Sequence, residues 1–201
     1  MSRRSLCAAA ALLAAALAIQ GCAASPHTPA NADASSATAP DVDTIDRVLE
    51  SPATAQLAAS FLRSQNPPTT ESLPTLHRTG PHVMVYATNP SFATDPQSPL
   101  DNAGTPSYIA IPTKIDPRTE PDTVQLDPTA PYAPRAIATG TEESQAAQAL
   151  PPDAQLLLDY PSHTWFAWTE THVTAISSST YTDMKGREFD TNQFKQWLAS
   201  R

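Results

Sequence analysis

Residues 154–178, AQLLLDYPSHTWFAWTETHVTAISS, decide the fold because three short strand-like segments follow one another here with turns between them. Residues 154–160 are apolar and short, which predicts a buried strand, and Pro161-Ser162 then turns the chain. Residues 163–169 predict the next strand. Residues 172–178, rich in Val, Thr and Ile, predict a strand that returns beside it.

Aromatic side chains occur on both faces of segment 163–169. In an extended chain Trp165 and Ala167 point to one side, and Phe166 and Trp168 point to the other. Aromatic residues on both faces favour a core strand beneath two helices. At most one face is left for a ligand, so either Trp165 or Trp168, which lie on opposite faces, would then stack on a sugar ring.

The end of the chain predicts a helix over residues 190–200. Asp190 is the expected N-cap and Gln193 is placed to complete a capping box, while Phe189 and Phe194 have the spacing of a hydrophobic staple. The helix has one apolar face, which should dock on the sheet: Phe194, Trp197 and Leu198.

Residues 42–65 also have a helical pattern of apolar side chains. Ser51-Pro52 predicts the N-cap and first-turn proline of a second helix, and Asn66-Pro67-Pro68 predicts its end. We expect the helices at 43–65 and 190–200 to cover a mainly antiparallel sheet of about five strands. The predicted fold class is therefore α+β, in a single globular domain of residues 42–201.

The middle of the chain is rich in proline and in polar residues. It predicts a linker at 67–81, a long polar loop at 89–106, and strands at 82–88, 107–111, 123–126 and 132–139. Thr139 and Glu142 have the spacing of a capping box, which predicts a short helix that reaches Leu150.

The start of the chain has the pattern of a secretory signal peptide. Arg3 and Arg4 are followed by an apolar run from Leu6 to Ile19. This run is shorter than the roughly 20 apolar residues that an ordinary membrane-spanning helix needs. Residues 23–41 lack any large apolar side chain, which predicts a disordered linker between this segment and the domain.

The residues that end the apolar run, Ile19-Gln20-Gly21-Cys22, resemble the lipobox of bacterial lipoproteins. The resemblance implies that residues 1–21 are a signal peptide cut off before Cys22. It also implies that Cys22 is acylated on its thiol and on its new amino group, so that it anchors the chain in a lipid bilayer. Because Ala23 rather than Asp follows Cys22, the resemblance implies the outer membrane, with the domain in the periplasm.

The formal net charge is −8 at pH 7, and loss of Arg3 and Arg4 with the signal peptide makes it more negative by two. An acidic surface disfavours nucleic acid and suits a basic protein partner. Cys7 also leaves with the signal peptide, so the mature chain has Cys22 alone and no internal disulfide is expected.

Two histidines, His163 and His172, flank the predicted hairpin with Glu170 between them. They are candidate ligand-facing residues, but they lack the spacing of a metal motif, so we expect neither a metal nor a cofactor. Ser177–Thr180 with Asp159 and His163 suggest a triad, but no Gly-x-Ser-x-Gly elbow presents a serine. No catalytic residue is therefore assigned, although a carboxylate pair for glycoside hydrolysis stays open.

The sequence favours a membrane-anchored envelope lipoprotein, without enzyme activity, that acts as a periplasmic binding or inhibitor-type protein. Its expected partner is a basic periplasmic protein or peptidoglycan. Two alternatives stay open. One is a cell-wall hydrolase or other envelope enzyme, and the other is a structural component of an envelope assembly or secretion system.

Overall fold

The computed structural model describes residues 40–65 and 72–201. These residues belong to one compact unit. The predicted signal peptide at 1–21, the lipidation site Cys22 and nearly all of the predicted linker at 22–41 lie outside the described residues.

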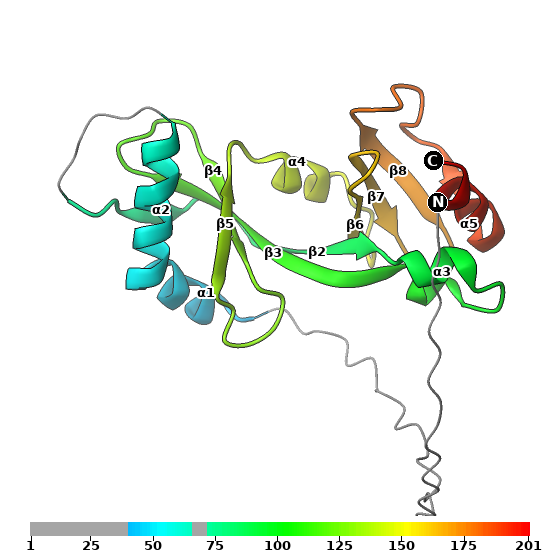
Figure 1. Ribbon diagram of the computed structural model, residues 1–201, viewed down its shortest axis with the longest axis horizontal. Helices are drawn as coiled ribbons and strands as arrows, with labels where there is room; N and C mark the ends of the chain where they lie inside the picture. The colour runs from blue at the N-terminus through cyan, green and yellow to red at the C-terminus, as the bar shows by residue number, and fades with distance from the viewer. Residues whose placement is uncertain (1–39, 66–71) are drawn as a thin grey trace, which may run out of the picture. The chain divides into compact units, whose positions relative to one another are not determined.

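Within the described residues the chain forms a nine-stranded, mainly antiparallel sheet, which confirms the predicted α+β class (Figure 1). Its order is β5-β4-β3-β2-β6-β7-β8-β9, with β1 paired to β3, and only the pair β2–β6 is parallel. The strands are β1 (Leu76–Arg78), β2 (Val83–Thr88), β3 (Gly104–Ile115), β4 (Asp122–Leu126), β5 (Pro134–Ala138), β6 (Gln155–Asp159), β7 (Thr164–Trp168), β8 (Val173–Ser178) and β9 (Glu188–Phe189).

Five α-helices and one 3-10 turn accompany this sheet in the described part of the chain. They are α1 (Val42–Leu49), α2 (Pro52–Ser64), α3 (Pro90–Thr94), the 3-10 turn (Leu100–Asn102), α4 (Glu142–Gln148) and α5 (Thr191–Ser200). Apolar side chains of α1 and α2 pack against β3, β4 and β5, while α3 and α5 cover one face of β6–β8 (Figure 1). Helix α4 packs against β2, β3, β6 and β7 through a separate cluster. None of these helices is long and apolar enough to cross a membrane.

The sheet has nine strands rather than about five, and two of them, β1 and β9, lie in segments that were not predicted as strands. Strand β3 is also longer than the predicted strand at 107–111, because two prolines do not end it. Strand β3 runs through Pro106 and Pro112. Pro106 lies opposite Tyr86, beside a register shift where a missing N–H is tolerated. Pro112 lies where β1 has ended and β2 has not begun, and its carbonyl accepts a hydrogen bond from the Thr79 amide at 2.8 Å.

The two predicted capping boxes have opposite outcomes. In α5 the box is confirmed: Asp190 accepts from the Gln193 amide at 2.8 Å, and Gln193 accepts from the Asp190 amide at 3.0 Å. In α4 the prediction was wrong, because the helix begins at Glu142 and its N-cap is Thr141. The Glu142 carboxylate instead binds Trp165 and His163, so it is not available to cap the helix.

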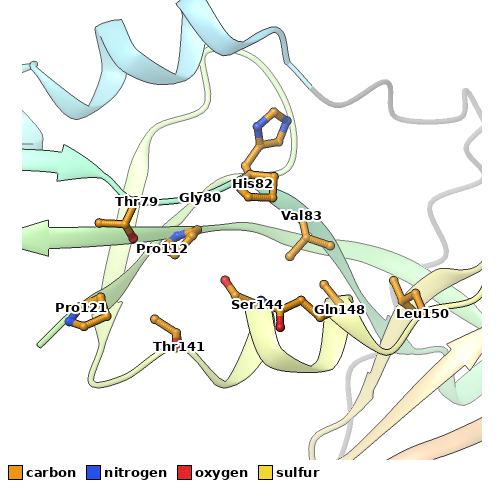
Figure 2. Close-up of a pocket in the computed structure, with 12 residues that line it drawn as sticks. Thr79, Gly80, His82, Val83, Pro112, Pro121, Thr141, Ser144, Gln148 and Leu150 are labelled. Carbon is orange, nitrogen blue, oxygen red and sulfur yellow. The ribbon is translucent and has the colours of Figure 1, made fainter.

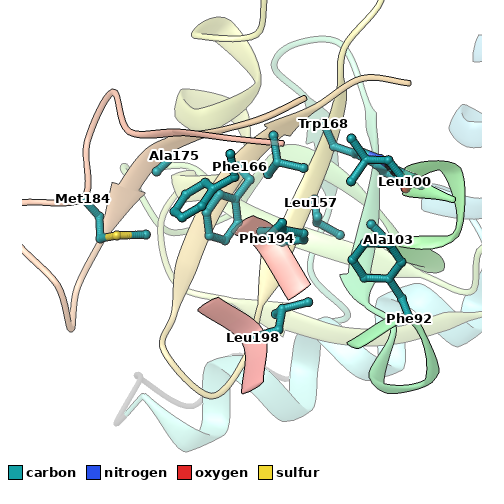
Figure 3. Close-up of a cluster of buried hydrophobic side chains, with 12 residues drawn as sticks. Phe92, Leu100, Ala103, Leu157, Phe166, Trp168, Ala175, Met184, Phe194 and Leu198 are labelled. Carbon is teal, nitrogen blue, oxygen red and sulfur yellow. Dashed lines mark hydrogen bonds between the residues drawn. The ribbon is translucent and has the colours of Figure 1, made fainter. Parts of the chain in front are cut away.

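The predicted alternation along β7 is confirmed. Phe166 and Trp168 belong to the cluster under α3 and α5 (Figure 3). Trp165 belongs to the cluster under α4. The first cluster contains the staple of α5, with the rings of Phe189 and Phe194 5.8 Å apart. Both sides of β7 are therefore core, and functional surface has to come from elsewhere in the fold.

Candidate functional site

A cavity of about 640 Å³, open to solvent, lies between α4, the connection from β1 to β2, and Pro112 of β3 (Figure 2). Its volume is within the range of roughly 300–1,000 Å³ that is usual for small-molecule sites. Its lining is mostly apolar, with a few hydroxyl and amide groups.

The first wall is one face of α4. Thr141, Ser144 and Gln148 recur at helical spacing and line the cavity together with Ala147. These side chains are small or polar, so they leave space where a core helix would have large apolar residues. The opposite face holds α4 to the sheet, where Glu143 accepts hydrogen bonds from the Tyr108 hydroxyl at 3.1 Å and from Gln125 at 3.2 Å.

The second wall is residues 79–83 with Pro112. The hydrogen bond from Thr79 to Pro112 brings this connection against β3. A Cβ atom on Gly80 would lie only 3.2 Å from Cγ of Pro112, so a larger residue would fit here only if Pro112 shifted by a few tenths of an ångström. The backbone contact therefore fixes the position of Pro81 and His82 at the rim.

A buried ion pair fixes the far end of the cavity, where Pro121 lies. Asp122 is fully buried and accepts from Nε of Arg118 at 2.6 Å and from Nη2 at 3.1 Å. The same carboxylate accepts from the Gly140 amide at 3.3 Å, just before α4 begins. One carboxylate thus ties the β3–β4 turn to the start of the helix that forms the other wall.

Ser144 contributes a buried hydroxyl without a hydrogen-bond partner among the described residues. A helical serine usually donates to the carbonyl four residues earlier. Here that carbonyl, of Gly140, already accepts from the Thr123 hydroxyl at 2.8 Å. Because an unsatisfied buried hydroxyl costs about 1–3 kcal/mol, Ser144 is the group in this cavity that gains most from a polar ligand atom.

The cavity carries no formal charge at neutral pH. Its lining contains no Asp, Glu, Lys or Arg, and His82 is its one titratable side chain. Burial lowers the pKa of His82, the neighbouring positive charge of Arg78 lowers it further, and a hydrogen bond with the Pro40 backbone opposes both. The imidazole is therefore neutral at pH 7, and the site favours an uncharged ligand.

The structure places Trp165 and Trp168 in the core, 2 % and 6 % exposed. The indole of Trp165 donates to Glu142 at 2.8 Å, and that of Trp168 donates to the Leu100 carbonyl at 3.1 Å. Neither ring presents a face to solvent on which a ligand could stack.

The two candidate histidines lie at opposite ends of the β7–β8 hairpin. The register pairs Thr164 with Ser178 and Trp168 with Val173, so the full length of β7 separates His163 from His172. His163 contacts both Glu142 oxygens at 3.1 Å, whereas His172 contacts threonine hydroxyls. In residues 40–65 and 72–201 no three His, Cys, Asp or Glu side chains are grouped to hold a metal.

The residues of the suggested triad do not meet either. Asp159 is fully buried and accepts from the Ser162 hydroxyl at 2.5 Å and from Arg201 at 2.9 Å. Ser178 bonds to Thr164 at 2.7 Å, and His163 is turned toward Glu142. These contacts join strand ends and turns, and they leave no serine next to an imidazole.

The sequence analysis assigned a functional role to none of the residues that line the cavity. Part of the signal was present, since a helix near 139–150 was predicted and its repeat of small and polar residues is unusual for a helix over a sheet. The other wall comes from the segment expected to be a linker. Comparisons of the chain with protein-family models, with curated proteins and with solved structures find no match.

We expect Ser144→Ala to raise the free energy of unfolding of the ligand-free protein by about 1–2 kcal/mol. The substitution removes an unsatisfied buried hydroxyl and improves helix propensity. Denaturant unfolding of wild type and Ser144→Ala measures the gain, provided that the unfolding free energy of both proteins depends equally steeply on denaturant concentration. A loss of stability would mean that Ser144 already has a partner.

His82 should make the protein less stable in mild acid. Since its pKa is lowered on folding, the unfolded chain takes up a proton below about pH 6.5 before the folded protein does. The contribution of His82 to the free energy of unfolding is therefore complete above that pH. It is lost as the pH falls toward the pKa that His82 has in the folded protein. Unfolding free energies of wild type and His82→Gln between pH 5 and 7.5 test this, and parallel curves would contradict it.

Proposed function

We propose that the protein is a membrane-anchored envelope lipoprotein of the binding type, and that its ligand or partner inserts into the cavity beside α4. The observation that carries the proposal is the buried Ser144 hydroxyl, unpaired within the described residues, in a largely apolar cavity of about 640 Å³. Such a cavity, with a few polar groups directed into it, is the usual form of a binding site.

The chemistry of the lining favours binding over catalysis. A wall hydrolase of the glycosidase type uses two carboxyl groups that face each other across the scissile bond. The residues that line this cavity include no carboxylate, and the hydroxyls of Thr79, Thr141 and Ser144 have no base beside them in the lining except His82. The geometry therefore supports a periplasmic binding or inhibitor-type protein better than an envelope enzyme.

The expected partner is a basic periplasmic protein or a peptidoglycan fragment. The formal charge of −8 supports a basic protein that contacts the acidic surface outside the cavity, while the uncharged cavity receives an uncharged group. The start of the described chain lies close to the cavity, because the Pro40 backbone is near enough to His82 of the rim to raise its pKa. A chain that leaves the domain here would connect the cavity to a lipid anchor at Cys22, in the outer membrane.

The test is affinity capture from envelope extract with three versions of the protein. Ala147→Phe fills the cavity, and Ala149→Phe makes the same substitution at an exposed position of the same segment that does not line it. We expect one protein, wall fragment or lipid to be retained by wild type and Ala149→Phe and lost with Ala147→Phe. Equal retention by all three would overturn the role of the cavity.

The anchor is tested separately. Cys22→Ala should prevent acylation and release the protein from the membrane fraction, because the acyl chains are the expected source of attachment. Membrane fractionation and mass spectrometry of the intact mature protein measure this. Unchanged membrane association, or a wild-type mass without acyl groups, would contradict the lipoprotein assignment.

A further inference from the structure

We propose that the cavity beside α4 is a binding site for a long acyl chain, whose ester or amide carbonyl accepts a hydrogen bond from Ser144. The inference rests on the proposed binding function and names the ligand class for that site. It follows from the shape of the cavity, from the polarity of its lining and from its place next to the start of the domain.

The lining of the cavity follows the whole length of α4. Lining residues run from Thr141 at the start of the helix to Leu150 just beyond its end, with the β1–β2 connection along the other side (Figure 2). Nine helical steps correspond to about 14 Å. A site of this length, open to solvent, suits a linear chain better than a globular ligand.

The lining selects against the other ligands of an envelope. Sugar rings are usually held by aromatic faces, and no Trp, Tyr or Phe lines this cavity. An anionic or cationic group would find no formal opposite charge. A peptide would bring an N–H and a C=O with every residue, each of which needs a partner when buried. An acyl chain needs only apolar contact, which Pro81, Val83 and Leu150 supply.

Ser144 then has a defined role. Its hydroxyl lacks a partner among the described residues, and it lies between Thr141 and Gln148 on the face of α4 that lines the cavity. One carbonyl at the head of an acyl chain matches this single donor. This pairing also explains why α4 has a serine at a position where alanine would be more stable without a ligand.

Two sources present the same acyl chemistry, namely a lipid of the bilayer and the acyl groups expected on Cys22 of the same molecule. Cys22 lies 18 residues before Pro40, and an extended chain of that length reaches about 60 Å. Because the Pro40 backbone lies near His82 at the rim, an acyl group on Cys22 is within reach of the cavity.

The test uses cells that express the full chain and are fed a photoreactive fatty acid, which labels both sources. After illumination we expect a crosslink on residues 79–83 or 141–150 in wild type and in Ala149→Phe, and a loss of at least tenfold in Ala147→Phe. If Ala147→Phe does not fold, Gln148→Trp, at an exposed lining position, replaces it. A crosslinked Cys22 peptide identifies the protein's own acyl group, and a crosslinked phospholipid identifies the bilayer.

A second measurement uses protein that lacks the acyl groups expected on Cys22. Unlipidated mature chain with Cys22→Ala is titrated calorimetrically with monoacylglycerols of 8, 10 and 12 carbons below their micelle concentrations. We expect affinity to rise about fourfold per methylene until the cavity is filled, and Ser144→Ala to weaken binding about three- to tenfold. Absence of saturable binding together with absence of a crosslink would overturn the acyl site.

These outcomes separate the inference from the proposed function. If envelope capture depends on Ala147 but no acyl crosslink forms, the cavity binds a different ligand and only the acyl inference fails. If neither capture nor crosslinking responds to Ala147→Phe, the binding role of the cavity fails as well.

Discussion

Phe194→Ala should lower the free energy of unfolding by about 3–5 kcal/mol, the cost expected for removing a fully buried aromatic ring. Phe194 joins α5 to the sheet: its ring lies 5.3 Å from that of Phe166, 6.1 Å from that of Phe92, and stacks on Trp197 at 5.8 Å. Truncation leaves a cavity at the centre of this group, which surrounding rings cannot fill without leaving their rotamers.

The measurement is denaturant unfolding of wild type and Phe194→Ala, in which the dependence of the unfolding free energy on denaturant concentration should be unchanged. Phe61→Ala on α2 is the matched control, because Phe61 is only partly buried and packs at the edge of a smaller cluster. We expect the control to cost clearly less than Phe194→Ala. Equal losses would show that α5 is not the main support of the β6–β8 half of the sheet.

The same helix shows why part of the fold could be predicted from the sequence. The capping box of Asp190 and Gln193 and the staple of Phe189 and Phe194 are set by residues within one turn of each other, so no knowledge of the rest of the chain is needed. The alternation along β7 is equally local. Both predictions are confirmed because the sequence that specifies them is contiguous.

Other features depend on pairings that a contiguous sequence does not specify. Pro106 and Pro112 suggested the ends of a short strand, yet β3 continues through both because a bulge and a gap between β1 and β2 accommodate them. The cavity likewise needs two segments far apart in the chain, residues 79–83 and α4. Its key group, Ser144, has no partner among the described residues, and the carbonyl of Gly140 accepts from Thr123.

Aromatic residues were a misleading guide to function here. Trp165 and Trp168 were the candidates for ligand contact, but each uses its indole N–H to fasten one element to the sheet. An indole with a satisfied N–H and a buried ring is a structural group. In this fold the space for a ligand instead adjoins side chains too small to fill it, such as Ala147.

Arg118→Ala should lower the free energy of unfolding by about 3 kcal/mol, since it leaves the carboxylate of Asp122 buried without its counter-charge. Asp122 is fully buried, and the guanidinium of Arg118 provides two of its hydrogen bonds. The remaining bond, from the Gly140 amide at 3.3 Å, is too long to replace them. Because Gly140 precedes α4, the loss should also loosen that wall of the cavity.

Lys114→Ala is the control, because Lys114 and its partner Asp116 are about half exposed and 3.5 Å apart, and exposed pairs are typically worth less than 1 kcal/mol. The double variant Arg118→Met with Asp122→Leu removes both charges, so it should recover most of the stability lost in Arg118→Ala. Recovery would assign the loss to an unpaired buried charge. A double variant as unstable as Arg118→Ala would show instead that the hydrogen bond that Asp122 accepts from the Gly140 amide holds this part of the fold together.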